Sequence, residues 1–242
     1  MAICSFERIE KKYLMTKAQY QAFMTAAADE LAIDEYGLHT ISNIYFDTLQ
    51  DDLIRRSIEK PVYKEKMRLR SYGVPGEDSP VFLEIKKKFK GVVYKRRVQM
   101  TLKEARAYLQ EDVLPADQGQ IMQEIDYFRR FYGVVPRQFI AYDRIAMFGL
   151  NDKSIRLTID QNIRERKGDL ALEHGSYGRR ILPQDYYLME IKVPGAVPLW
   201  MVRILDELKI YPVSFSKYGE AYKQKMHFMY SQNQLLRRAA AR

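Results

Sequence analysis

The stretch "YKEKMRLRSYG" (residues 63–73) constrains the fold most, because it lines up like charges along an extended chain. Side chains alternate between the two faces of a strand, so one face carries Lys64, Lys66, Arg68 and Arg70. Consecutive same-face side chains lie about 6.6–6.8 Å apart, and each such pair costs roughly 2 kcal/mol at an effective dielectric of about 20. The strand therefore has either a well-solvated outer face or a face that binds a polyanion.

The same pattern recurs along the chain, where polar strand faces are built mainly from basic residues with a lone carboxylate beside them. Alternating segments predict eight strands, over residues 6–15, 40–48, 63–73, 80–89, 92–100, 137–148, 154–163 and 186–195. Alternation leaves two arrangements open: an open sheet with its charged face in water, or a barrel with that face inside. The repetition favours the barrel, a basic tunnel whose apolar outer faces are covered by helices.

Helices are predicted between these strands. Thr16 can cap a helix over 17–31, and Thr101 can cap one over 102–109 with Glu104 completing a capping box. A helix over 117–133 ends at Gly133, and others follow over 196–208 and about 217–240. No internal repeat or linker interrupts the chain. We expect one α+β domain over 1–242, an eight-stranded antiparallel β-barrel with flanking helices.

The net charge of +9 and the pI near 9.4 indicate an acidic partner: nucleic acid, anionic lipid or a phosphorylated small molecule. A single cysteine, Cys4, excludes an internal disulfide and fits a reducing compartment. No apolar run reaches the roughly 18–20 residues that span a bilayer, and the N-terminus lacks a signal-peptide core, so we expect a cytoplasmic protein. The chain has neither a P-loop nor a Gly-x-Ser-x-Gly elbow.

Several motifs together resemble a known family. "RIEKKY" (8–13) is similar to the Glu-x-Glu-x-Lys motif of the triphosphate tunnel metalloenzyme (CYTH) superfamily, with Arg8 at the first glutamate. In order, the chain also contains "IYFDT" (44–48), "MRLRSYG" (67–73), "FLEIKKK" (82–88), "AYDRIAM" (141–147), "IRLTIDQNI" (155–163), "LMEIKVPG" (188–195) and "FSKYGEA" (215–221). This set resembles the polyphosphate polymerase domain of the vacuolar transporter chaperone (VTC) group over residues 5–227. Arg8 favours that branch over the hydrolytic and cyclase branches.

The resemblance implies that the γ-phosphate of ATP is transferred to a growing inorganic polyphosphate chain, assisted by Mn²⁺ or Mg²⁺. Carried over by position, the tunnel-wall residues acting in transfer would be Lys12, Arg68, Arg70, Lys86, Arg144, Arg156 and Lys192. Further phosphate contacts would come from Arg8, Tyr142, Ser216, Lys217 and one of Lys95 and Arg96. The metal would bind Glu190, while Glu10 and Glu84 would be either second ligands or ion-pair partners of the cations.

The residue types suit this chemistry. Phosphoryl transfer depends on positioning and charge neutralisation, and Arg can hold two phosphate oxygens where Lys supplies a compact charge. A carboxylate such as Glu190 among cations stays ionised, which makes it a poor general base and a suitable ligand for a hard divalent ion. Two alternatives stay open: a triphosphatase of the same fold, in which water is the acceptor, and a non-catalytic polyanion- or RNA-binding module. Of these partners, we favour ATP with polyphosphate or triphosphate over nucleic acid.

Overall fold

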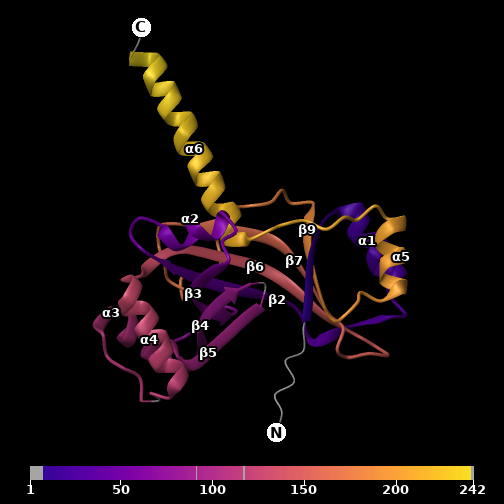
Figure 1. The fold of residues 1–242 in the computed structure, drawn as a ribbon, viewed down its shortest axis with the longest axis horizontal. Coiled ribbons are helices and arrows are strands. Elements are labelled where there is room, and N and C mark those ends of the chain that lie inside the picture. The colour runs from indigo at the N-terminus through magenta and orange to yellow at the C-terminus, as the bar shows by residue number, and fades with distance from the viewer. Residues whose placement is uncertain (1–7, 91, 117, 241–242) are drawn as a thin grey trace.

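The computed structural model describes residues 8–90, 92–116 and 118–240, with side chains described at 9–90, 92–116 and 118–231. The strands are β1 (Arg8–Thr16), β2 (Leu31–Asp47), β3 (Tyr63–Tyr72), β4 (Pro80–Phe89), β5 (Val92–Thr101), β6 (Val135–Gly149), β7 (Arg156–Arg166), β8 (Arg179–Arg180) and β9 (Tyr186–Pro194). The helices are α1 (Lys17–Ala26), α2 (Asp52–Ile58), α3 (Leu102–Glu111), α4 (Gln120–Tyr132), α5 (Leu199–Glu207) and α6 (Lys217–Ala240) (Figure 1).

Eight long strands form one antiparallel sheet, in the order β1-β9-β7-β6-β2-β3-β4-β5, and the short β8 pairs with β7. The sheet is strongly curled: Lys86 of β4 lies in the electrostatic field of Glu10 and Lys12 of β1, although β4 and β1 stand far apart in the strand order. Among the described residues no ladder joins the edge strands β1 and β5. The predicted eight-stranded antiparallel tunnel is confirmed, with backbone pairing along this path.

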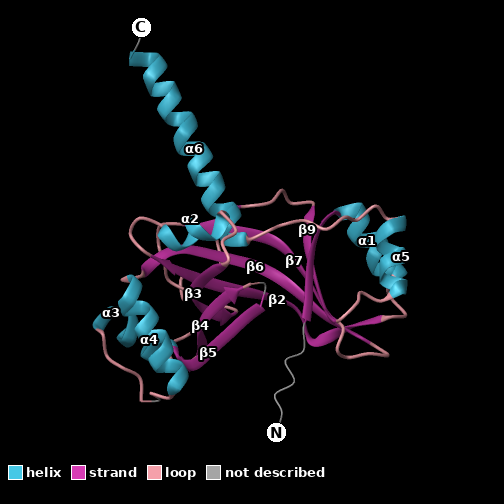
Figure 2. Cartoon of the chain, viewed as in Figure 1, coloured by secondary structure: helices cyan, strands magenta, loops and turns pink. Residues whose placement is uncertain are grey.

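The apolar strand faces point outward and are covered by helices, as predicted. Outward residues of β3 and β4, including Met67 and Leu83, pack against α3 and α4 through Tyr108, Ile125 and Phe128. A second core packs β1, β7 and β9 against α1 and α5, and Figure 2 shows these helix pairs on separate flanks of the sheet. The charged faces are therefore left on the inside of the curve.

A third core fills one end of this curve. There, Tyr45 of β2 stacks on Tyr218 of α6 with ring centroids 4.9 Å apart, and Ile54 of α2 and Ile140 of β6 pack beside them. Beyond these first turns, α6 extends away from the body of the protein (Figure 1). No helix of the described residues is both long and apolar enough to cross a membrane.

Local signals place most helix ends. Thr16 and Thr101 each form a capping box, with Gln19 and Glu104 respectively, and α4 ends at Gly133 in the left-handed conformation at φ 58°. The helix predicted over 17–31 instead ends at Ala26, and a turn leads into β2. This strand begins at Leu31, well before the predicted residue 40. The prediction missed its first part because a register shift between Ile33 and Leu38 disrupts the alternation there. The seven-residue α2 is too short for a periodic pattern and was not predicted.

Candidate functional site

The inner side of the curved sheet carries the charged residues that the sequence singled out. On the β1–β9 wall, Glu10 lies opposite Lys192 and Lys12 opposite Glu190 in the strand register. The Lys12 ammonium is 3.5 Å from Glu190 and 3.7 Å from Glu10, and Lys192 is 2.6 Å from Glu190. Burial raises the pKa of Glu190, but Lys192 and Lys12 outweigh it, so the pKa lies well below its usual range. The Glu190 side chain is therefore ionised at neutral pH.

Two further predicted residues belong to this wall. Arg156 of β7 lies opposite Lys192 of β9 and is exposed. Arg8 pairs through its backbone with Pro194, but its side chain lies outside the described side chains, so its predicted phosphate contact stays a prediction.

On the opposite wall, Glu84 of β4 is the centre of a basic cluster. Its carboxylate is 2.6 Å from Arg68, 3.9 Å from Arg70 and 3.1 Å from Lys95, and its side chain is only 2% exposed. Burial raises the pKa of Glu84, yet the three cations bring it down to about 2. Of the two roles considered for Glu84, this geometry matches the ion-pair partner that orients the basic residues. Its role as a second metal ligand stays a prediction.

The choice between Lys95 and Arg96 is decided by strand alternation. Lys95 lies opposite Lys86, on the inner face, whereas Arg96 lies opposite the buried Ile85 on the outer face. The Arg96 guanidinium is 3.8 Å from Glu124 of α4. Arg96 is therefore no longer a candidate for phosphate binding in the tunnel. Lys95 is the member of the pair that lines the tunnel.

Between these walls, Tyr142 of β6 is buried among cations. The Arg144 guanidinium lies 5.0 Å and the Lys217 ammonium 4.3 Å from the centre of its ring, and Arg70 donates a 3.5 Å hydrogen bond to its hydroxyl. Burial raises the pKa of Tyr142, but these three cations lower it to about 8. Both Arg144 and Lys217 also pair with the buried Asp160.

The start of α6 enters the site from the closed end. Ser216 caps the helix by accepting a hydrogen bond from the backbone N–H of Gly219 at 3.2 Å. The Lys66 ammonium donates to the Ser216 hydroxyl at 3.2 Å, and Lys12 donates to the carbonyl of Phe215 at 3.1 Å. A helix N-terminus carries partial positive charge and favours anions, so this segment adds to the positive potential of the tunnel.

Sequence reasoning missed two members of this cluster, Lys66 and Asp160. The available signal for Lys66 was that it shares one strand face with Arg68 and Arg70, but no family motif included it. Burial, followed by the charges of neighbouring cations, lowers the pKa of Lys66 to about 7. The same alternation places Asp160 on the inner face of β7, opposite Arg144.

Two carboxylates of the β1–β9 wall are suitable donors for a divalent ion. Glu10 and Glu190 both lie within 4 Å of the Lys12 ammonium. Two carboxylates from adjacent strands are therefore close to the same positive charge. Mg²⁺ commonly binds through one or two carboxylates, with phosphate oxygens and water completing its shell. The pair fits that mode. No group of three or more His, Cys, Asp or Glu residues with metal-site geometry occurs among the described residues.

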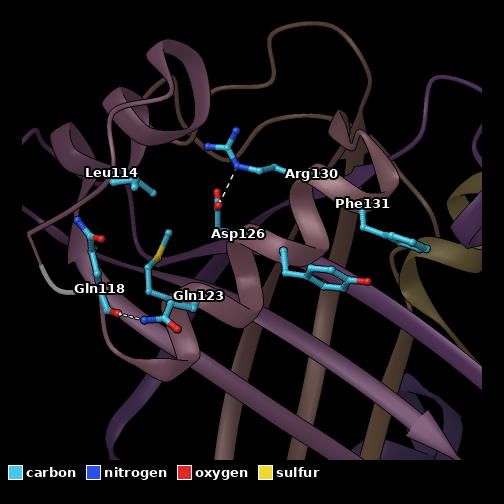
Figure 3. A pocket seen from close by; sticks show the side chains of 8 residues that line it. Leu114, Gln118, Gln123, Asp126, Arg130 and Phe131 are labelled. Atoms are coloured by element: carbon cyan, nitrogen blue, oxygen red, sulfur yellow. Dashed lines mark hydrogen bonds and ion pairs between the residues drawn. The ribbon is translucent and has the colours of Figure 1, made fainter.

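A separate cavity of about 550 Å³ lies on the outside, between α4 and the segment before it (Figure 3). It is lined by Leu114, Gln118, Met122, Gln123, Asp126, Tyr127, Arg130 and Phe131. The Arg130 guanidinium is paired with Asp126 at 2.8 Å. This cavity shares none of the inner-face cations, and we regard it as unrelated to the charged site.

An antiparallel sheet curled around rows of cations and buried carboxylates is the architecture of the triphosphate-tunnel fold. The chain belongs to the VTC domain family, whose sequence profile matches residues 7–226. Among solved structures, a candidate adenylate cyclase from Bacillus halodurans aligns with a TM-score of 0.54 and 16% identity, covering 86% of this chain and 93% of that one. A candidate adenylate cyclase from Vibrio parahaemolyticus gives 0.50 and 12%, covering 89% and 97%. At these identities the likeness concerns the fold. No curated protein matches the chain.

Proposed function

We propose that this chain transfers the γ-phosphate of ATP onto the end of an inorganic polyphosphate chain inside the tunnel. The observation that carries the proposal is a set of cations on facing walls of one curled sheet, joined by Lys217 from the start of α6. The cations on the sheet are Lys12, Arg68, Arg70, Lys86, Lys95, Arg144, Arg156 and Lys192. Membership of the VTC domain family supports it. A polyphosphate chain carries charge along its whole length, and cations along a tunnel match that distribution better than a compact pocket would.

In the proposed reaction, a terminal oxygen of polyphosphate attacks the γ-phosphorus, the bond to the bridging oxygen breaks, and ADP leaves with that oxygen. Arg68 and Arg70, held in place by Glu84, would grip adjacent phosphates from one wall. Lys12 and Lys192 would neutralise charge from the other wall, and positioning of this kind accounts for most phosphoryl-transfer catalysis. The terminal phosphate is a competent nucleophile without a protein base.

Glu190 and Glu10 would hold Mn²⁺ or Mg²⁺ in this proposal. When bound, the ion would neutralise charge on the transferring phosphoryl oxygens. A cytoplasmic location is also part of the proposal, since the single Cys4 fits a reducing compartment.

The test is incubation of the purified protein with ATP and Mn²⁺, with the products resolved by gel. Long-chain polyphosphate supports the transferase. Free phosphate without polyphosphate would overturn it in favour of a triphosphatase of the same fold. Binding of polyanions with neither product would leave a non-catalytic binding module, whose affinity would fall with salt.

A further inference from the structure

A chain of aromatic rings continues the inner face of the sheet beyond Arg70. Tyr36 and His39 of β2 have ring centroids 6.2 Å apart, His39 and Tyr72 of β3 are 6.1 Å apart, and Tyr72 and Phe82 of β4 are 5.6 Å apart. The four rings thus bridge three adjacent strands. We call these four residues the aromatic rim.

The rim lies beside the phosphate-binding candidates. Phe82 is directly opposite Arg70 in the β3–β4 ladder, and Tyr72 follows Arg70 at the next position on the same face, about 6.6–6.8 Å along the strand. His39 is directly opposite Arg144 in the β2–β6 ladder. If the phosphates of a ligand bind Arg70 and Arg144, the group attached to those phosphates would contact the rim.

The rim lies at the more exposed end of the inner face. At the other end, Tyr45 and Tyr218 are 7% and 4% exposed, because α6 and α2 cover them. By contrast, Tyr72 is 49% and Tyr36 is 69% exposed. Large aromatic side chains exposed together beside a charged site are typical of ligand-binding surfaces.

We propose that the aromatic rim binds the base of a nucleoside triphosphate whose phosphates occupy the tunnel. This inference rests on the proposed function and assigns the residues that bind the base of its nucleotide donor. Stacking on an aromatic side chain is sequence-tolerant, since every base offers a π-face. The rim therefore selects for a base without selecting strongly among bases.

Arg97 of β5 lies beside the rim. Its guanidinium lies 5.0 Å from the centre of the Phe82 ring, and it follows Lys95 on the inner face, opposite Glu84. A guanidinium plane can itself stack on a base. Along β3 the phosphate-binding cations Arg68 and Arg70 come first and Tyr72 follows, which matches the order of phosphates and base in a nucleoside triphosphate.

The experiment compares the affinities of ATP, GTP and inorganic triphosphate by calorimetry for the wild type, Tyr72→Leu and Tyr94→Leu. Leu keeps apolar volume at position 72 but removes the ring face. Tyr94 is the matched control, since it is 54% exposed in the neighbouring β5 but lies opposite Lys87 on the outer face.

We expect Tyr72→Leu to weaken ATP and GTP binding by about tenfold and to leave inorganic triphosphate binding unchanged. Tyr94→Leu should change none of the three. Equal weakening of all three ligands by Tyr72→Leu, or no weakening of any, would overturn the inference. Wild-type protein that binds inorganic triphosphate as tightly as ATP would overturn it without any variant. If no triphosphate binds the wild type at all, the proposed function fails instead.

Discussion

Lys95 and Arg96 are consecutive in β5 but belong to different chemical environments. The Lys95 ammonium lies 3.1 Å from Glu84 inside the tunnel, whereas the Arg96 guanidinium lies 3.8 Å from Glu124 of α4 outside it. Burial lowers the pKa of Lys95, although Glu84 opposes this effect. The two residues carry similar charge at neighbouring positions, so they offer a matched pair for separating tunnel binding from general electrostatic attraction.

We expect Lys95→Ala to weaken inorganic triphosphate binding by about tenfold, as for the loss of a charge-assisted hydrogen bond. Arg96→Ala removes the same formal charge from the outer face and should change the affinity less than twofold. Calorimetric titration at one fixed salt concentration makes the comparison. Equal losses in both variants would mean that only the overall charge of β5 matters, which would contradict the assignment of Lys95 to the site.

Glu84 should contribute strongly to stability. Its carboxylate is 2% exposed and paired with Arg68, Arg70 and Lys95, and removing one partner of a buried ion pair typically costs about 3–5 kcal/mol. We expect Glu84→Gln to lower the free energy of unfolding in urea by about that amount. Glu77→Gln is the control, because Glu77 pairs with Arg106 at the surface with a side chain 63% exposed, and should leave the stability unchanged.

The pH dependence of the free energy of unfolding provides a second test of the contribution of Glu84 to stability. Because its folded pKa is lowered to about 2, its contribution is fully present above the unfolded pKa, about 4.3, and is lost as the pH falls from there toward 2. The wild type should lose more stability than Glu84→Gln across this range. Parallel curves for the two proteins would contradict the assignment.

Much of this site follows from alternation alone. The inward position of Arg68 and Arg70 follows from the cation row of β3, and the outward position of Met67 from the same pattern. Alternation did not decide between Lys95 and Arg96, because every residue from Val92 to Arg97 is exposed and β5 therefore has no apolar face to mark the outside. The outer position of Arg96 is shown instead by its ion pair with Glu124 of α4, which is distant in sequence.

Two features of the site could be recognised only from the assembled sheet and not from the sequence. The pairing of Arg144 with Asp160 depends on the β6–β7 register, which shifts between Ala141 and Asp143, and no local pattern reports such a shift. The aromatic rim likewise joins residues from three strands, and its members are unremarkable in each strand separately. Long-range register is therefore the part of this fold that a single sequence conveys least.

Lys66 should couple triphosphate binding to proton uptake. Its pKa is lowered to about 7, first by burial and then by Lys64, Lys86, Lys12 and Arg68, so a large fraction is neutral just above pH 7. A bound anion favours the charged ammonium, raises this pKa and draws in a proton. Affinity should therefore fall as the pH rises above about 7.

Calorimetry at pH 7.5 in two buffers with different ionisation enthalpies measures the protons taken up. We expect net uptake in the wild type and a smaller value in Lys66→Met. The remainder would come from Tyr142, whose pKa is lowered to about 8 by the cations around its ring despite its burial. The same uptake in Lys66→Met as in the wild type would show that Lys66 does not titrate with the ligand.

Substitution of Glu190 tests the metal dependence, because without a bound metal ion a carboxylate in this tunnel would only weaken anion binding. It repels phosphate, yet Lys12 and Lys192 hold it ionised. We expect Glu190→Gln to reduce Mn²⁺-dependent turnover of ATP by more than a hundredfold, while inorganic triphosphate measured without metal binds at least as tightly as to the wild type. Full turnover in Glu190→Gln would refute the metal role. Loss of both turnover and metal-free binding would instead mean that Glu190 only orients the two lysines, since a misplaced Lys12 would bind phosphate poorly with or without an ion.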